Sequence, residues 1–185
     1  MEDSVLRLIE LFNRLFAESY NTRLIAGDDE PIYLPADHHF PYHRVVFAHG
    51  YFASVMHEVA HWCVAGAERR LLEDFGYWYR PDGRTTEQQA EFEQVEIKPQ
   101  AMEWIFTRAS QRKFHISADN LTGAHHDDSQ FRFAVARQAR YYLSQGLPTR
   151  AALWAEALQQ EFKGQLALQD FYWPDEYKVG AEMTV

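Results

Sequence analysis

The residues that could do chemistry in this chain concentrate in one short segment, His57-Glu58-Val59-Ala60-His61. Residues four positions apart lie one turn apart on the same face of an α-helix, so both imidazoles can point at one ion. Glu58 follows His57 and lies about 100° around the helix, where it can lean over the ion without binding it. The motif therefore predicts a divalent-metal site with Glu58 as a candidate catalytic residue.

A third metal ligand must come from elsewhere in the chain, because two histidines alone hold a metal weakly. A carboxylate suits both catalytic zinc and mononuclear iron. Glu96 and Glu103 share a helix face if their helix is continuous, but their spacing does not choose between them. The alternative for any single glutamate is an ordinary solvated carboxylate on a helix. The downstream candidates are Glu91, Glu93, Glu96 and Glu103.

Two predicted helices carry these side chains. Apolar residues recur at helical spacing from Tyr51 to about Val64, which places the motif inside a helix that Gly66 could end. The glutamates lie in a second predicted helix from Thr86 to Arg112, which Pro99 kinks or divides. The remaining pattern predicts helices at residues 4–18, 68–75, 129–144 and 149–163, strands at 32–34 and 45–48, and an irregular segment at 117–128.

Helices dominate this pattern, so we predict an α+β fold in which residues 1–185 form a single, mainly helical domain with a small sheet. The length is enough for one core, and 46% hydrophobic residues indicate a globular chain. The single cysteine, Cys63, excludes an intramolecular disulfide and a thiolate metal cluster. It points away from His61 on the helix, which predicts a core position.

Charge and hydropathy narrow the expected partners. The net charge of −9 argues against binding to phosphate backbones, so nucleic acid is not an expected partner. No apolar run reaches the roughly 20 residues needed to cross a bilayer. The first residues, Met1 to Ser4, are acidic, unlike the basic start of a signal peptide. These features predict a cytoplasmic protein without a membrane partner.

Several longer runs are more specific than the metal motif. They occupy residues 16–37, 46–50, 57–63, 74–84, 95–101 and 119–121, and they include Asn21-Thr22-Arg23-Leu24-Ile25 and Val95-Glu96-Ile97-Lys98-Pro99-Gln100-Ala101. In these runs the chain resembles the bacterial elongation factor P hydroxylase family. The resemblance covers nearly the whole chain up to about residue 121. Beyond that point only length and helical character are similar.

The resemblance implies an iron-dependent monooxygenase that hydroxylates the β-lysylated lysine of translation elongation factor P, with dioxygen as co-substrate. It also implies a site of two histidines and one carboxylate in a zincin-like fold, related to zinc metalloproteases. On this basis His57 and His61 are carried over as ligands of Fe(II). Glu96 is the best match for the third ligand, because the run around it is the more specific one.

Two other interpretations remain open at this point. A zinc metallopeptidase of the gluzincin type would use Glu58 as general base for a zinc-bound water, and the metal motif alone favours it. A non-catalytic module with a structural metal would unfold when the metal is removed. The long matching runs place the hydroxylase first.

A lysine-bearing substrate would need an acidic or aromatic lining. The acidic loop Asp28-Asp29-Glu30 is one candidate, and His49 is a candidate pocket residue. The segment His126-Asp127-Asp128 starts like the metal motif of 2-oxoglutarate-dependent hydroxylases. No histidine follows it, so we interpret residues 125–128 as a polar loop. The aromatic candidates for the pocket wall are Trp62, Tyr77, Trp78, Tyr79 and Trp104, each of which could equally belong to the core.

Overall fold

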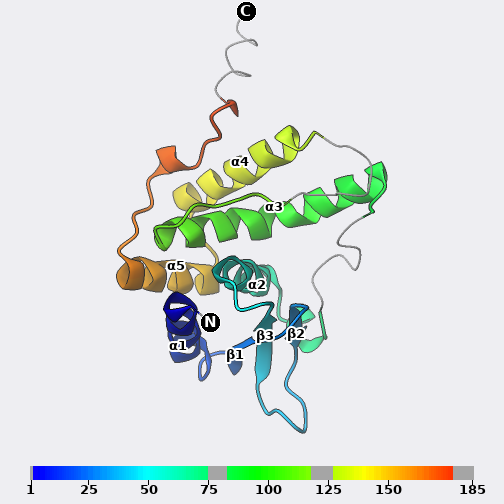
Figure 1. The fold of residues 1–185 in the computed structure, drawn as a ribbon, viewed down its shortest axis with the longest axis vertical. Helices are drawn as coiled ribbons and strands as arrows, with labels where there is room; N and C mark the ends of the chain where they lie inside the picture. The colour runs from blue at the N-terminus through cyan, green and yellow to red at the C-terminus, as the bar shows by residue number, and fades with distance from the viewer. Residues whose placement is uncertain (1, 75–82, 118–126, 177–185) are drawn as a thin grey trace, which may run out of the picture.

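The computed structural model describes residues 2–74, 83–117 and 127–176 (Figure 1). The described chain forms five α-helices and one three-stranded sheet, which confirms a mainly helical α+β fold. The helices are α1 (Asp3–Phe16), α2 (Phe52–Val64), α3 (Thr86–Ala109), α4 (Ser129–Gln145) and α5 (Thr149–Phe162). The strands are β1 (Thr22–Ala26), β2 (Ile32–Leu34) and β3 (His43–Phe47), and short 3₁₀ helices occupy Arg69–Leu71 and Leu168–Asp170.

Helix α2 lies at the centre of this arrangement. It packs against β3 on one side and against α3 on the other, and α3 in turn packs against α4 (Figure 1). Helices α1 and α5 contact each other and also contact α2. The segment with the histidine motif is therefore supported by both the sheet and the helical layer. None of the described helices is long and apolar enough to cross a membrane.

The sheet has the order β1-β3-β2 and mixes two kinds of pairing. Strand β1 is parallel to β3, with Thr22 opposite His43, whereas β2 is antiparallel to β3, with Tyr33 opposite Val45. The sequence pattern did not predict β1. Its hydrogen-bond partner lies about 20 residues further along the chain, and such a non-local pairing leaves no short-range turn signal in the sequence.

An aromatic cluster fills the space between α1, α2 and α5. Phe12 and Phe16 of α1 each meet the Trp62 ring edge-on, at centroid distances of 5.1 and 4.9 Å. Trp154 of α5 packs edge-on against Phe12 at 5.7 Å. Such pairs contribute about 0.5–1.5 kcal/mol each beyond the burial of their surface. Cys63 is also buried in this core, as predicted.

Helix α3 begins with a capping box. The Thr85 hydroxyl accepts a hydrogen bond from the Gln88 backbone amide, and the Gln88 side chain accepts one from the Thr85 amide. The helix then continues through Pro99 to Ala109. This confirms the predicted long helix, and it places Glu96 and Glu103 on one continuous element.

The structure differs from the predicted secondary structure at residues 68–75. The helix predicted at residues 68–75 is wrong, because only Arg69–Leu71 form a 3₁₀ turn. Asp74 instead forms a two-way backbone bridge with Tyr33, at 2.7 and 3.0 Å, which holds it in an extended conformation. Most of the irregular segment predicted at 117–128 lies outside the described residues. The relation to the zincin fold stays a prediction.

Candidate metal centre

The two histidines of α2 face the two buried glutamates of α3. Glu96 lies beside His61, and Glu103 lies beside His57. The earlier histidine therefore meets the later glutamate, as expected for helices that run in opposite directions. The side chains of Glu96 and Glu103 are only 4% and 9% exposed, so neither is the solvated helix carboxylate of the alternative interpretation.

His57, His61 and Glu96 form a compact donor group. The Nε2 atom of His61 lies 3.0 Å from Nε2 of His57 and 3.2 Å from Oε1 of Glu96. One ligand atom from each of the three side chains lies within 4.8 Å of the other two. Two ligand atoms about 2.1 Å from a shared ion lie roughly 3 to 3.4 Å apart. These three residues fit one bound metal ion.

Glu103 has a different position. Its Oε2 atom lies 2.9 Å from Nδ1 of His57, on the opposite side of the ring from the Nε2 atom that faces His61. Metal-binding histidines commonly donate their second ring N–H to a carboxylate, which fixes the tautomer and the ring orientation. The fold thus separates the two glutamates that spacing alone could not separate. Of the other candidates, Glu91 is exposed and Glu93 accepts a hydrogen bond from Gln89.

Charge compensates for burial in this group. Burial would raise the pKa of Glu96, but its hydrogen bond to His61 and the charges of His61 and His57 prevail and lower it to about 2. Burial likewise opposes a charged His57, yet the hydrogen bond and charge of Glu103 prevail and raise the pKa of this imidazole. The Glu96 carboxylate is thus ionised at neutral pH, which suits a cation.

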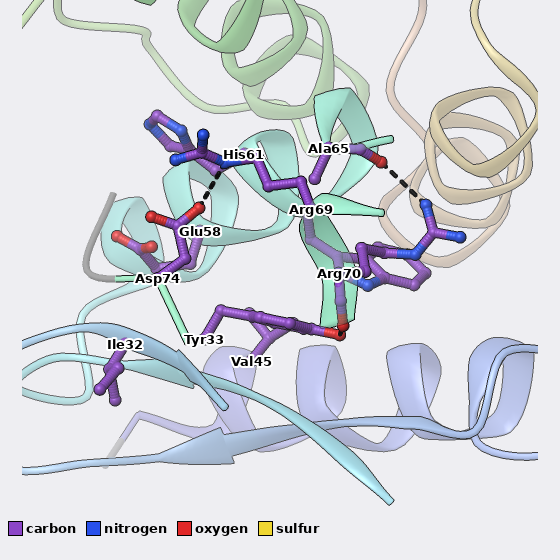
Figure 2. A pocket seen from close by; sticks show the side chains of 10 residues that line it. Ile32, Tyr33, Val45, Glu58, His61, Ala65, Arg69, Arg70 and Asp74 are labelled. Carbon is purple, nitrogen blue, oxygen red and sulfur yellow. Dashed lines mark hydrogen bonds and ion pairs between the residues drawn. The ribbon is translucent and has the colours of Figure 1, made fainter. Parts of the chain in front are cut away.

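A pocket adjoins this group on the side of the sheet. Glu58 and His61 line it from α2, and the segment that carries Arg69 and Asp74 lies beside them (Figure 2). The Arg69 guanidinium is paired with the Asp74 carboxylate, with Nε 2.7 Å from Oδ2. Burial raises the pKa of Glu58, although the nearby His57 and His61 oppose this. The pocket walls also include Ile32, Tyr33, Val45, Trp62, Ala65 and Arg70.

The other predicted pocket residues fall in several places. Trp104 packs against Phe114 and Trp173 at centroid distances of 5.2 and 4.8 Å, so it belongs to the core. The acidic loop Asp28-Asp29-Glu30 is exposed, and the backbone carbonyl of Asp28 accepts a hydrogen bond from His49. His49 is exposed too, with its ring near that of Tyr51. Tyr77, Trp78, Tyr79, His125 and His126 lie outside the described residues.

The comparison with known proteins covers most of the chain. Residues 11–171 match the family model described as elongation factor P hydroxylase. The chain is 52% identical over 158 residues to the elongation factor P lysine hydroxylase of Haemophilus influenzae, a match that covers 85% of this chain and 89% of the relative. The chain belongs to the elongation factor P hydroxylase family. This confirms the resemblance found in the sequence.

The family match also extends that resemblance. It includes α2 and α3 with all the candidate ligands, and it continues through α4 and α5, where the sequence runs alone showed no specific similarity. Neither comparison supports the metallopeptidase alternative. Family membership therefore associates the His57-Glu58-Val59-Ala60-His61 motif of this chain with hydroxylation and not with peptide cleavage.

One residue of the site was not identified from the sequence. Gln100 is fully buried beside Glu96 and donates a hydrogen bond to its Oε2 atom at 3.2 Å. The two residues are four positions apart, so helical spacing could have indicated the contact. A glutamine carries no metal-ligand signal of its own, so the sequence did not indicate its role at the site.

Proposed function

We propose that this protein is an iron-dependent monooxygenase that hydroxylates the β-lysylated lysine of elongation factor P. The observation that carries the proposal is the donor group of His57, His61 and Glu96 in a chain of the elongation factor P hydroxylase family. The named relative supports the lysine as the target. The protein substrate would be met in the cytoplasm, and the net charge of −9 suits a cationic target better than nucleic acid.

The donor set fits iron, but it does not by itself exclude zinc. Two histidines and one carboxylate form the ligand set of many non-haem iron oxygenases, and they also occur in zinc peptidases. Activation of dioxygen at a metal centre needs a redox-active metal, and zinc has no redox chemistry. Membership of a hydroxylase family therefore favours Fe(II). When bound, iron would supply the activation of dioxygen at coordination positions that the three protein ligands leave open.

The protein's own residues would hold and orient the reacting groups. His57, His61 and Glu96 would bind the ion, and Glu103 would fix the ring of His57 through its 2.9 Å contact with Nδ1. The His57 and His61 side chains are 29% and 14% exposed, so a substrate could reach this group from solvent. The histidines on α2 and Glu96 on α3 are held by two packed helices, which favours precise placement of a C–H bond.

The pocket beside His61 is the candidate site for the lysine side chain. Its walls combine the apolar side chains of Ile32 and Val45 with the carboxyl group of Glu58. Two arginines also line it, and each has a partner: Arg69 pairs with Asp74, and Arg70 donates a hydrogen bond to the Ala65 carbonyl. Apolar walls suit the methylene groups of lysine, and a carboxylate suits an ammonium group. We therefore assign Glu58 to substrate binding beside the donor group of His57, His61 and Glu96.

Anaerobic reconstitution with Fe(II) tests the proposal. Purified protein would be loaded with iron, mixed with lysylated elongation factor P and a reductant, and then exposed to air or kept anaerobic. We expect the modified lysine to gain the mass of one oxygen atom only in air, as measured by mass spectrometry. Unlysylated elongation factor P is the matched substrate control. An iron-loaded protein that leaves lysylated elongation factor P unchanged in air would contradict the proposal.

The variant Glu58→Gln separates the hydroxylase from the peptidase. A peptidase would lose nearly all activity without its general base. In the hydroxylase the substitution replaces the carboxyl group of the pocket wall with an amide, so we expect a higher KM for the lysylated protein and retained iron binding. A normal KM in this variant would rule out the proposed contact between Glu58 and the substrate.

A further inference from the structure

A buried amide connects Glu96 to the chain segment that follows α3. The Gln100 side chain is fully buried, and its Nε2 donates hydrogen bonds to Oε2 of Glu96 at 3.2 Å and to the carbonyl of Ser117 at 2.8 Å. Its Oε1 accepts a hydrogen bond from the Ser117 amide at 3.0 Å. Both amide hydrogens and the carbonyl oxygen of this side chain therefore have partners.

The backbone of Ser117 fixes which way the amide faces. A backbone N–H can only donate and a backbone carbonyl can only accept, so Oε1 must face the Ser117 amide and Nε2 must face its carbonyl. A rotation of the side-chain amide by half a turn would break both bonds and turn Oε1 toward the Glu96 carboxylate. The remaining hydrogen on Nε2 is thus held toward Glu96.

The two oxygens of Glu96 consequently have different partners. Oε1 lies 3.2 Å from Nε2 of His61, inside the donor group, whereas Oε2 is held by Gln100. An oxygen that accepts a hydrogen bond from a buried amide is less available as a second ligand to the same ion. Only Oε1 of Glu96 therefore faces the two histidines of the donor group.

We infer that Gln100 is a positioning residue that keeps Glu96 a one-oxygen ligand. The inference rests on the proposed function, because it assumes that Glu96 binds the metal. A carboxylate that bound through both oxygens would occupy a further coordination position. A monooxygenase needs open positions for dioxygen, and the second bond from Glu96 would reduce them. Gln100 therefore keeps a coordination position of the metal open for dioxygen.

The variants Gln100→Met and Gln100→Asn test this inference. Methionine has nearly the shape of glutamine but no donor, and asparagine keeps the amide but is one methylene too short to reach both partners. Cobalt(II) would be added to the metal-free proteins anaerobically, and its visible absorption spectrum and dissociation constant would be measured. Hydroxylation of lysylated elongation factor P would be assayed separately with Fe(II).

Two matched variants serve as controls. Gln94→Met changes an exposed glutamine on the same helix, and Ser117→Ala leaves the two backbone bonds to Gln100 intact. We expect both controls to keep the wild-type cobalt spectrum and affinity. In contrast, Gln100→Met and Gln100→Asn should alter the spectrum, since the number of oxygen ligands changes. We also expect an affinity change of about 10- to 100-fold, the usual range for partners of metal ligands.

The outcomes distinguish the two levels of the proposal. If a folded Gln100 variant keeps the wild-type spectrum and affinity, Gln100 does not set the binding mode of Glu96, while the proposed function stands. If the wild-type protein itself binds neither cobalt nor iron, the proposed function fails. Circular dichroism establishes folding, and the asparagine variant decides the question should the methionine variant fail to fold.

Discussion

The two faces of α2 use burial in opposite ways. Toward α1 and α5 the helix presents Trp62, which packs edge-on against Phe12 and Phe16. Toward α3 it presents His57 and His61, which lie against buried glutamates. The first face gains free energy from removing apolar surface from water, at about 1.5–3 kcal/mol for a fully buried large side chain.

On the second face, the removal of charged groups from water costs several kcal/mol per ion unless each charge is paired. In this protein each histidine lies within 3.2 Å of a buried glutamate, His57 beside Glu103 and His61 beside Glu96. The two faces of α2 therefore have different roles. The aromatic face packs the helix into the core, and the polar face carries the groups that we propose to bind a metal.

Removing a ligand should have the largest effect on function. We expect His61→Ala to abolish stoichiometric metal binding and hydroxylation, because both Nε2 contacts to His57 and Glu96 disappear with the ring. The aromatic face is untouched, so far-UV circular dichroism of the variant should remain that of a folded helical protein. One bound metal per chain in His61→Ala, measured by elemental analysis, would contradict the assigned ligand.

Removing the aromatic anchor should have the largest effect on stability. Trp62→Ala should lower the free energy of unfolding by about 3–5 kcal/mol, the range for buried aromatic residues replaced by alanine. The measurement is urea unfolding of the metal-free protein. Molecules that remain folded should still bind metal through the opposite face. A variant with normal stability would show that the aromatic contacts do not anchor α2.

A smaller effect is expected when only the partner of a ligand is removed. Glu103→Ala takes away the carboxylate that holds Nδ1 of His57 and should weaken metal binding about 10- to 100-fold. The exposed Glu91 on the same helix is the control, and Glu91→Ala should leave the affinity unchanged. Complete loss of metal in Glu103→Ala, with full occupancy in Glu96→Ala, would reverse the two roles.

The smallest effect concerns Cys63 on the core side of α2. Burial raises the pKa of its thiol from 9.0 to about 12, although Arg150 and Arg70 oppose this. The thiol is therefore neutral in the folded state, and the stability it contributes is complete below pH 9 and is lost as the pH rises toward 12. Alkylation by iodoacetamide at pH 8 should be slow in the native protein and fast in urea. Equal alkylation rates in the native protein and in urea would mean that the core around Cys63 opens readily to solvent.

Local sequence was enough to predict much of the helical framework. Amphipathic spacing indicated α1, α2 and α5. It also indicated helix across the whole of α3, but it left open whether Pro99 divides that helix, which the structure shows to be continuous. These elements depend on hydrogen bonds between residues four apart, so their signal lies within a short window of the chain. Strand β1 and the extended bridge between Tyr33 and Asp74 depend on partners far along the chain and could not be predicted in this way.

The sequence by itself determined that His57 and His61 would share a helix face, because one turn of an α-helix separates them. Helical spacing did not determine which glutamate would join them, and only the family resemblance favoured Glu96. Glu96 and Glu103 occupy the same face of α3, and only the alignment of α3 against α2 places Glu96 beside His61 and Glu103 behind His57. That alignment arises from packing between elements distant in the chain, so the tertiary structure alone gives the two equivalent carboxylates different surroundings.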